Sequence, residues 1–223
     1  MNGQLRKNTD DENEVNITPP SGEKKVLLHS CCAPCSASVM ERLHKAGIEL
    51  TVFFYNPNIQ PKREYEVRKT ENIRYAQKMG VPFIDADYDP ERWFLLTKGH
   101  ETDPERSERC SICFEMRLVN TAAYAAEHGF KVITSCGGIS RWKDFDQVTR
   151  CGIMAASFFP GVTYWAHNWR AGGGTQRMSQ ILKEENFYLQ RYCGCIYSDQ
   201  SARPARPSGV EAAGVLCADE VPG

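Results

Sequence analysis

Short apolar runs alternate with longer amphipathic segments along the middle of this chain. Strands are expected where leucine, β-branched and aromatic residues cluster, as in KVLLH at 25–29 and LTVFFY at 50–55. Helices are expected where apolar residues recur every three or four positions ahead of a glycine. The complete pattern predicts strands at 25–29, 50–55, 82–85, 131–135 and 162–165, and helices at 36–46, 62–79, 106–128, 144–157 and 179–191.

The alternation of strand and helix predicts the fold class. Strands that are each followed by a helix form a mostly parallel sheet covered on both faces, here an α/β three-layer sandwich in a single domain. Ligands of such folds bind beyond the carboxyl ends of the strands. The segment HSCCAPCS at 29–36 begins where the first predicted strand ends. Its cysteines are therefore expected at the binding edge of the sheet.

The two ends of the chain differ from the middle in composition. Residues 1–23 are polar and acidic, and residues 199–223 are rich in proline, alanine, glycine and serine. Both are predicted to be disordered tails around a folded domain at 24–198. The net charge of −1 excludes a globally basic protein that coats nucleic acid. No apolar run approaches the ~20 residues of a membrane span, and the first residues lack the apolar core of a secretory leader. A cytoplasmic protein without membrane contact is expected.

Ten cysteines change this picture, because closely spaced thiols in a reducing compartment favour metal or redox chemistry. Cys31, Cys32 and Cys35 lie in the turn between the first strand and the first helix. A helix N-terminus there favours the thiolate form, which is the form that binds iron and zinc. A thioredoxin-like dithiol of Cys32 and Cys35 is the alternative interpretation, although the adjacent Cys31 does not belong to such a motif.

Two further cysteine pairs follow. Cys110 and Cys113 are three positions apart in a predicted helix, so they share one face and can hold one metal centre, with structural zinc as the alternative. Cys193 and Cys195 flank a glycine, and such a pair forms a strained, easily reduced disulfide or chelates a metal.

The number of grouped thiols bears on the kind of site. Seven grouped thiols exceed the four that a cubane iron–sulfur cluster or a structural zinc requires. The surplus predicts a cluster accompanied by a second metal or by a redox dithiol. Cys136 and Cys151 are assigned to packing, and Cys217 is an incidental thiol of the tail.

Six blocks of the sequence resemble, in order, the metal-dependent epoxyqueuosine reductase family of the QueH type: HSCCAPCS, FFYNPNI, RCSICFEMR, SCGGISRWK, WRAGGGTQRM and YCGCIYS. The resemblance implies a HUP-type (adenine-nucleotide-hydrolase-like) fold and an oxidoreductase that converts epoxyqueuosine to queuosine at the tRNA wobble position, the last step of queuosine biosynthesis. It also implies a [4Fe-4S] cluster with an additional iron beside it. In that family the cluster ligands correspond to Cys31, Cys32, Cys110 and Cys113.

The same resemblance assigns catalytic roles to the remaining grouped thiols. Cys193 and Cys195 are expected to be a redox-active pair that forms a disulfide, or ligands of the additional iron, and Cys35 is expected to contribute to that second metal. Converting an epoxide to an alkene consumes two electrons, whereas a cubane cluster transfers one at a time. A second redox centre, or an external electron donor that acts twice, is therefore expected. The candidates for proton donor are His29, Asp144 and Tyr192, and a structural role is favoured for His29.

Two loops that follow the fourth and fifth strands combine glycines with basic and aromatic residues. Arginine and lysine contact phosphates, and exposed aromatic rings stack on the unpaired bases of an anticodon loop. Burial in the core is the alternative for each tryptophan. The helix at 62–78 is interpreted as a solvated face rather than an RNA platform. The predicted tRNA-binding residues are Arg141, Trp142, Lys143, Trp169, Arg170 and Arg177.

Three other functions would also use this composition. An ATP-dependent tRNA-modifying enzyme of the same fold is disfavoured, because the first strand is followed by SCCAPCS and lacks the glycines of a phosphate loop. A zinc-stabilised RNA-binding module predicts a colourless protein. A thioredoxin-like oxidoreductase predicts that Cys32 and Cys35 suffice for activity.

Overall fold

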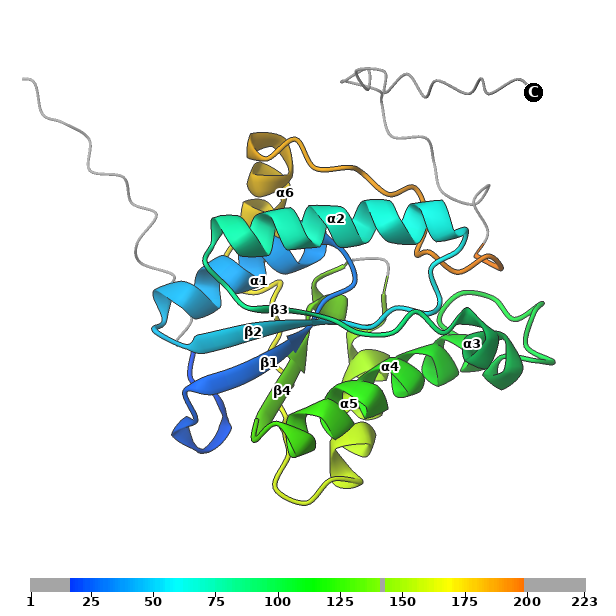
Figure 1. Cartoon of the computed structure of the whole chain (residues 1–223), viewed down its shortest axis with the longest axis horizontal. Helices are drawn as coiled ribbons and strands as arrows, with labels where there is room; N and C mark the ends of the chain where they lie inside the picture. The colour runs from blue at the N-terminus through cyan, green and yellow to red at the C-terminus, as the bar shows by residue number, and fades with distance from the viewer. Residues whose placement is uncertain (1–16, 141–142, 199–223) are drawn as a thin grey trace, which may run out of the picture.

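Five parallel strands form one sheet in the computed structural model, which describes residues 17–140 and 143–198 (Figure 1). The order across the sheet is β3-β2-β1-β4-β5, so β1 has β2 on one side and β4 on the other. The order reverses between β1 and β4, and a fold of this kind binds its ligands at that point, beyond the carboxyl ends of the strands. The strands are β1 (Lys25–His29), β2 (Glu49–Phe54), β3 (Phe83–Asp85), β4 (Val132–Ser135) and β5 (Thr163–Tyr164).

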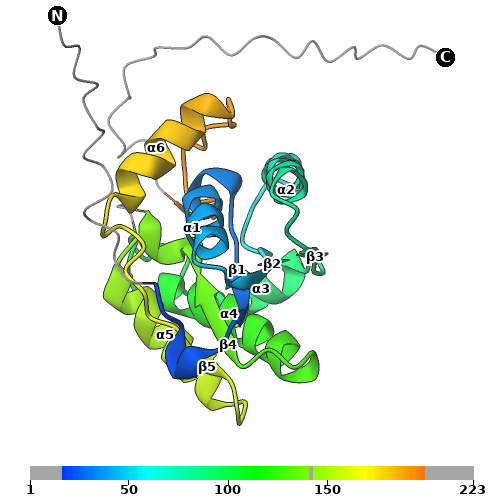
Figure 2. The same cartoon turned by 90° about the vertical axis from the view of Figure 1, so that its left-hand side faces the viewer.

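Helices cover both faces of the sheet, which confirms the predicted single α/β domain with three layers (Figures 1 and 2). Val26 and Leu28 of β1 point to one layer, where they pack with residues of α1 and α6. Leu27 points to the opposite layer and packs with residues of α3 and α4. Because both faces of β1 are buried, its sequence is apolar throughout rather than alternating. The helices are α1 (Ala33–Lys45), α2 (Lys62–Lys78), α3 (Pro90–Leu96), α4 (Glu108–Glu127), α5 (Phe145–Ser157) and α6 (Gly174–Glu184).

The helix α3 was not expected from the sequence pattern. It has seven residues, begins at Pro90 and is capped by Asp89, whose carboxylate accepts the Arg92 backbone N–H at 3.1 Å. Only Trp93 of this helix is fully buried, whereas Leu95 is exposed. A single core residue gives no helical periodicity, so the pattern could not indicate this helix.

The prediction of a last helix at 179–191 is wrong at both ends. Helix α6 begins at Gly174, directly after Gly173 in a left-handed conformation, and ends at Glu184. Asn186 then adopts a positive φ of 49°, a conformation in which a helix cannot continue. The following segment, 185–198, is not helical and runs along α2 toward the carboxyl ends of the strands (Figure 1). The structure thereby brings the last cysteine pair to the edge where β1 ends.

The described residues begin at Ile17 and end at Ser198. Ile17 packs against the core cluster beside α1, and 20–22 form a single 3₁₀ turn. Residues 1–16 and 199–223, including Cys217, lie outside the described residues. Within 17–140 and 143–198, no helix is both long and apolar enough to cross a bilayer.

Candidate metal and redox site

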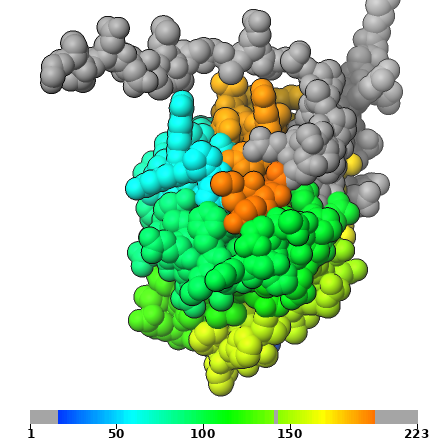
Figure 3. Space-filling model, turned by 90° about the vertical axis from the view of Figure 1, so that its right-hand side faces the viewer, coloured from blue at the N-terminus to red at the C-terminus, as the bar shows by residue number. Residues whose placement is uncertain are grey.

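The grouped cysteines lie at the carboxyl edge of the sheet. Cys31 and Cys32 follow β1, Cys110 and Cys113 lie in the first turns of α4, and 185–198 carries the third pair. Figure 3 views this edge of the molecule, with 185–198 in orange between α2 in cyan and the green region of α3 and α4. Segments that are far apart in sequence therefore meet where this fold type places its ligand.

Cys31, Cys32 and Cys35 form the tightest thiol group. Their Sγ atoms all lie within 4.8 Å of one another, and the Sγ atoms of Cys31 and Cys32 are 3.9 Å apart. Cys32 is the N-cap residue of α1, and Pro34 occupies its first turn. Proline is favoured there because the first helical N–H has no partner to lose, so α1 begins three residues earlier than predicted. The early start places all three sulfurs around one helix N-terminus.

Cys136 joins this group, although the sequence analysis assigned it to packing. Its sulfur accepts a hydrogen bond from the Cys31 backbone N–H at 3.4 Å, and the two Sγ atoms are 3.6 Å apart. Cys136 follows β4 directly, and β4 is the neighbour of β1. Cys151, in contrast, packs against Phe114 and Leu118 as predicted.

Two cations lie against the thiols. Lys143 Nζ is 3.6 Å from the Cys31 sulfur. Arg117 is only 4% exposed, its Nε donates to the Cys113 carbonyl at 3.0 Å, and its guanidinium lies 5.0 Å from the centre of the Phe114 ring. Among the residues that the structure describes, neither cation forms an ion pair with a carboxylate. Because a buried cation needs a compensating anion, the thiolates are the groups that balance this charge.

The charge of Arg117 interacts with all three cysteine groups. Burial opposes the charge of Arg117, yet Cys113, Cys31 and Cys193 hold its pKa above the ordinary value. The pKa of the Cys31 thiol is held well below its ordinary range, chiefly by the hydrogen bonds of the neighbouring cysteine thiols and to a smaller extent by Lys143. One member of each predicted cysteine group therefore lies in the field of a single buried guanidinium.

The pair on α4 is less closely grouped than the first three thiols. Cys113 is buried, whereas Cys110 is partly exposed and its sulfur accepts the Arg106 backbone N–H at 3.3 Å. Burial raises the pKa of Cys110, and the charges of Cys113 and Cys193 add to that effect. The structure thus brings Cys110 and Cys113 toward the same site, while the compact group within 4.8 Å consists of Cys31, Cys32 and Cys35.

Cys193 and Cys195 have opposite proton affinities. A hydrogen bond from Cys195 lowers the pKa of Cys193 to about 5, against the effect of burial. The pKa of Cys195 is raised, first by that same interaction and then by burial. At neutral pH the pair shares one proton, with Cys193 as the thiolate. A thiolate beside a thiol is the arrangement that thiol–disulfide exchange requires.

The loop that carries this pair is held by α2. Arg68 donates to the Cys193 carbonyl and to the Tyr192 carbonyl, each at 3.1 Å, and its charge is paired with Glu64 at 2.7 Å. Gly194 has a φ of 107°, a conformation that favours glycine, and its carbonyl accepts the backbone N–H of residue 60 at 2.8 Å. Arg68 is only 3% exposed. The interpretation of the helix at 62–78 as wholly solvated is therefore wrong at this position.

Substitution of Arg68 by lysine should loosen this loop. Lysine keeps the charge beside Glu64, but its compact ammonium lacks the planar fork with which the guanidinium reaches Glu64 and both carbonyls together, so at least one of these hydrogen bonds is lost. Losing one hydrogen bond worth about 1.4 kcal/mol makes opening of the loop about tenfold more frequent. We expect alkylation of the buried Cys195 to become faster by that factor, measured by mass spectrometry after timed exposure to iodoacetamide. Arg74→Lys is the matched control, because Arg74 lies on the same helix and pairs with Glu185 at the surface. Equal rates in Arg68→Lys and the wild type would show that Arg68 does not hold the loop.

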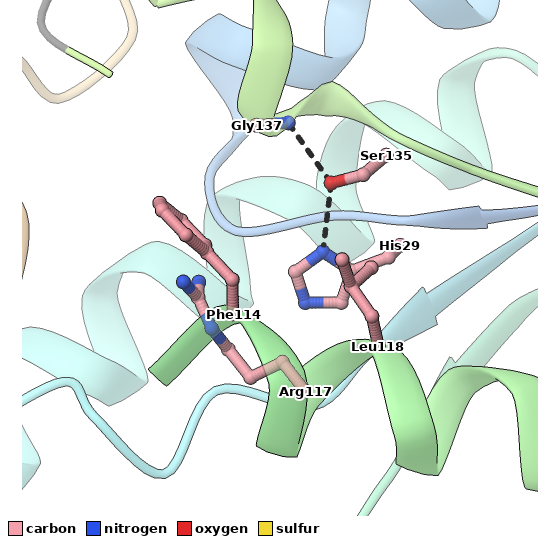
Figure 4. A pocket seen from close by; sticks show the side chains of 6 residues that line it. All are labelled: His29, Phe114, Arg117, Leu118, Ser135 and Gly137. Carbon is pink, nitrogen blue, oxygen red and sulfur yellow. Dashed lines mark hydrogen bonds between the residues drawn. The ribbon is translucent and has the colours of Figure 1, made fainter. Parts of the chain in front are cut away.

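His29 is structural rather than a proton donor. Its Nε2 lies 3.3 Å from the Tyr55 carbonyl, which only accepts, so Nε2 carries the hydrogen. Its Nδ1 then accepts from the Ser135 hydroxyl at 3.1 Å, and that hydroxyl accepts the Gly137 N–H at 3.0 Å (Figure 4). Burial, followed by the charge of Arg117, lowers the pKa of His29 to about 3. The neighbouring pocket has no room for a water molecule that would relay a proton.

The buried neutral His29 makes the stability of the metal-free protein depend on pH. In the unfolded chain the histidine pKa is 6.5, so between pH 6.5 and about 3 only the unfolded state binds the proton. The contribution of the neutral His29 to the free energy of unfolding is complete above pH 6.5. It is lost as the pH falls, by up to about 1.4 kcal/mol per pH unit. We expect His29→Asn to flatten the decline in unfolding free energy measured in urea between pH 7 and 4.5. His44→Asn, at an exposed position on α1, should keep the wild-type slope; an unchanged slope in His29→Asn would contradict the assignment.

The other two candidate proton donors are also occupied. The Asp144 carboxylate accepts the Gln147 backbone N–H at 2.9 Å and caps α5, and this contact lowers its pKa. The Tyr192 hydroxyl donates to the Gln60 carbonyl. Both groups therefore hold the backbone in this structure.

The predicted tRNA-binding residues separate into two kinds. Trp169 is 1% exposed, and its indole N–H donates to the Thr134 hydroxyl at 3.3 Å, so it packs in the core and cannot stack on a base. Arg177 joins α6 to α1 through Glu41 at 2.7 Å, so its charge is already paired. For these two positions the sequence interpretation is corrected: the side chains that look suited to RNA form the core and a helix contact.

The remaining predicted positions lie near the loop after β4. Arg170 donates to the Lys143 carbonyl at 2.9 Å and to the Ser140 carbonyl. It therefore holds the start and end of 140–143, and Lys143 reaches the thiol group rather than the surface. Arg141 and Trp142 lie outside the described residues.

Comparison with known proteins agrees with this geometry. The family model for epoxyqueuosine reductase QueH matches residues 26–201. The epoxyqueuosine reductase QueH of Histophilus somni is 59% identical over 179 residues, which cover 80% of this chain and 74% of that protein. The corresponding protein of Acinetobacter baylyi is 54% identical over 184 residues, covering 82% and 84%, and that of Thermotoga maritima is 31% identical over 176 residues, covering 78% and 89%. The chain therefore belongs to the epoxyqueuosine reductase QueH family.

Proposed function

We propose that this chain is an oxidoreductase that converts epoxyqueuosine to queuosine at the wobble position of tRNA. The match to the family over residues 26–201 carries this proposal. The meeting of three cysteine groups at the carboxyl edge of the sheet supports it, because the reaction needs redox groups at one site. Since the substrate is a tRNA, the enzyme acts in the cytoplasm.

The residues at this edge suit an iron–sulfur cluster. Thiolates are its ligands, and a four-thiolate cubane carries net negative charge. Arg117, which is buried, and Lys143, which is partly buried, supply positive charge that no described carboxylate neutralises. We assign Cys31, Cys32, Cys110 and Cys113 as ligands of a [4Fe-4S] cluster, which when bound supplies electrons one at a time.

The third pair and Cys35 have separate roles in this proposal. Forming the alkene from the epoxide consumes two electrons and two protons and releases water. Oxidation of the thiolate–thiol pair of Cys193 and Cys195 to a disulfide releases two electrons and one proton, and solvent supplies the second proton, so the two changes balance. An external electron donor then restores the dithiol. Cys35 lies within 4.8 Å of the first two cluster ligands and is the thiol available to an additional iron, which would act as a Lewis acid.

The chain itself positions the substrate and the charge. Arg170 donates to the carbonyls of Ser140 and Lys143, the residues that flank Arg141 and Trp142 in the sequence. We assign Arg141 and Trp142 to binding of the anticodon loop, Arg141 through phosphate contact and Trp142 through base stacking. Lys143 keeps positive charge beside Cys31, one of the assigned cluster ligands.

Anaerobic purification tests this function. We expect a brown protein with about four or more irons and matching sulfide per chain. It should convert tRNA-bound epoxyqueuosine to queuosine with a chemical reductant, as measured by mass spectrometry of the digested nucleosides. A colourless protein that contains zinc and takes up no iron on reconstitution would instead support an RNA-binding module. A loaded protein that leaves epoxyqueuosine unchanged would contradict the proposed reaction.

A further inference from the structure

We propose that Cys136 donates an S–H···S hydrogen bond to the sulfur of Cys31 and thereby tunes the reduction potential of the metal centre that Cys31 binds. The role of Cys31 as a ligand rests on the proposed function. Cys136 itself is a positioning residue in this proposal, because it acts through Cys31 and not as a ligand. It is fully buried, and neither the cluster ligand set nor the redox pair includes it.

The fold places these two sulfurs together through the backbone. β1 and β4 are adjacent, and His29 at the end of β1 is in register with Ser135 at the end of β4. The hydrogen bond between the side chains of His29 and Ser135 joins the two strand ends at 3.1 Å. Cys136 then opens the 3₁₀ turn η3 (Cys136–Ile139), which turns the chain toward Cys31. The contact therefore spans the point where the strand order reverses.

The direction of the hydrogen bond follows from the protons available. A metal-bound Cys31 is a thiolate and has no proton to donate. The Cys31 backbone N–H already donates to the Cys136 sulfur at 3.4 Å, so that sulfur is an acceptor in one contact. Its own S–H is not used in that contact and donates across the 3.6 Å to the Cys31 thiolate, which can only accept. A donor that is itself hydrogen-bonded is a stronger donor, because the two bonds polarise each other.

A hydrogen bond to a ligand sulfur changes the electronics of the centre. It stabilises negative charge on the sulfur, and reduction adds negative charge to the centre. The reduced state therefore gains more from this bond than the oxidised state. Removal of the donor should move the reduction potential to a more negative value without removing a ligand.

Four variants of the complete, iron-loaded chain test the proposal. Cys136→Ala and Cys136→Val remove the donor, and the valine keeps the site filled if alanine impairs folding. Cys136→Ser restores a donor. Cys151→Ala is the matched control, since Cys151 is also a buried cysteine but packs against Phe114 and Leu118 and donates to the Ser111 carbonyl at 3.8 Å. The measurements are the iron and sulfide content of each variant and the midpoint potential, from a redox titration followed by electron paramagnetic resonance.

The expected result is full iron content in each variant and a more negative potential in the two variants without a donor. At a fixed solution potential, we expect about a tenfold change in the ratio of reduced to oxidised centres. For a one-electron couple this corresponds to a shift of about 59 mV in the midpoint potential. Cys136→Ser should return toward the wild-type potential, and Cys151→Ala should match it. Wild-type potentials in Cys136→Ala and Cys136→Val would overturn the proposal, and so would loss of iron, which would make Cys136 a ligand. If the wild-type protein itself binds no iron–sulfur centre, the proposed function fails before any variant is compared.

Discussion

Replacement of Cys110 by alanine is expected to abolish the iron–sulfur centre and to lower the rate of epoxyqueuosine reduction about a hundredfold or more. Loss of even a supporting contact to a metal site costs 10- to 100-fold, and loss of a ligand costs at least as much. Cys110 lies on α4, far in sequence from the compact group of Cys31, Cys32 and Cys35. The substitution therefore asks whether α4 completes the cluster. Iron and sulfide content and single-turnover conversion of modified tRNA measure the outcome.

Cys35→Ala is the informative comparison for this experiment. In the assigned ligand set it should retain the cluster and lose activity, because Cys35 serves the additional iron. The reverse pattern, with the cluster lost in Cys35→Ala and kept in Cys110→Ala, would show that the compact group supplies three ligands. Unchanged activity in Cys110→Ala would favour a thioredoxin-like dithiol, since Cys32 and Cys35 would then suffice. Cys151→Ala, on the packing side of α5, controls for loss of a buried thiol.

Replacement of Arg117 by methionine is expected to keep or raise the stability of the metal-free protein and to lower the stability of the cluster-loaded protein. The guanidinium is buried, no carboxylate among the described residues pairs with it, and cysteine thiolates offset its charge in the metal-free protein. The desolvation cost of such a buried ion pair is comparable to its Coulombic gain. Methionine fills similar space without charge, and we expect the metal-free variant to be as stable as the wild type or about 1–3 kcal/mol more stable. In the loaded protein the same change leaves cluster charge uncompensated, which removes about 3–5 kcal/mol of the stabilisation that the cluster provides.

The gap between the melting temperatures of loaded and metal-free protein measures this effect, since a ligand stabilises the state that binds it. The gap should narrow in Arg117→Met and recover in Arg117→Lys, which keeps the charge. Arg74→Met, at an exposed position that pairs with Glu185, should leave the gap unchanged. A metal-free Arg117→Met that is several kcal/mol less stable than the wild type would show that Arg117 stabilises the fold itself and does not serve the cluster.

The local pattern of the sequence was sufficient for the fold class and for most elements. The five strands and the helices at 36–46, 62–79, 106–128 and 144–157 lie within three residues of their predicted ends, because burial of both sheet faces makes strands apolar and helices amphipathic. The cysteine groups were also evident from the sequence, since spacing within a turn or a helix is a local property. The alternation of strands and helices was enough to predict that these cysteine groups lie at the carboxyl edge of the sheet.

Contacts between distant residues depended on the tertiary structure. The sequence contains no local sign that β4 lies beside β1, so the meeting of Cys136 with Cys31, 105 residues apart, could not be predicted. The same holds for Arg68, which reads as a surface charge until the last segment of the chain covers it. Trp169 and Lys143 were predicted to face RNA, but Trp169 is buried in the core and Lys143 lies against the Cys31 sulfur. The burial and direction of a side chain depend on what packs over it, which the local sequence does not show. Spacing along the chain therefore determined which chemical groups are present, and the order of the strands decided which of them touch.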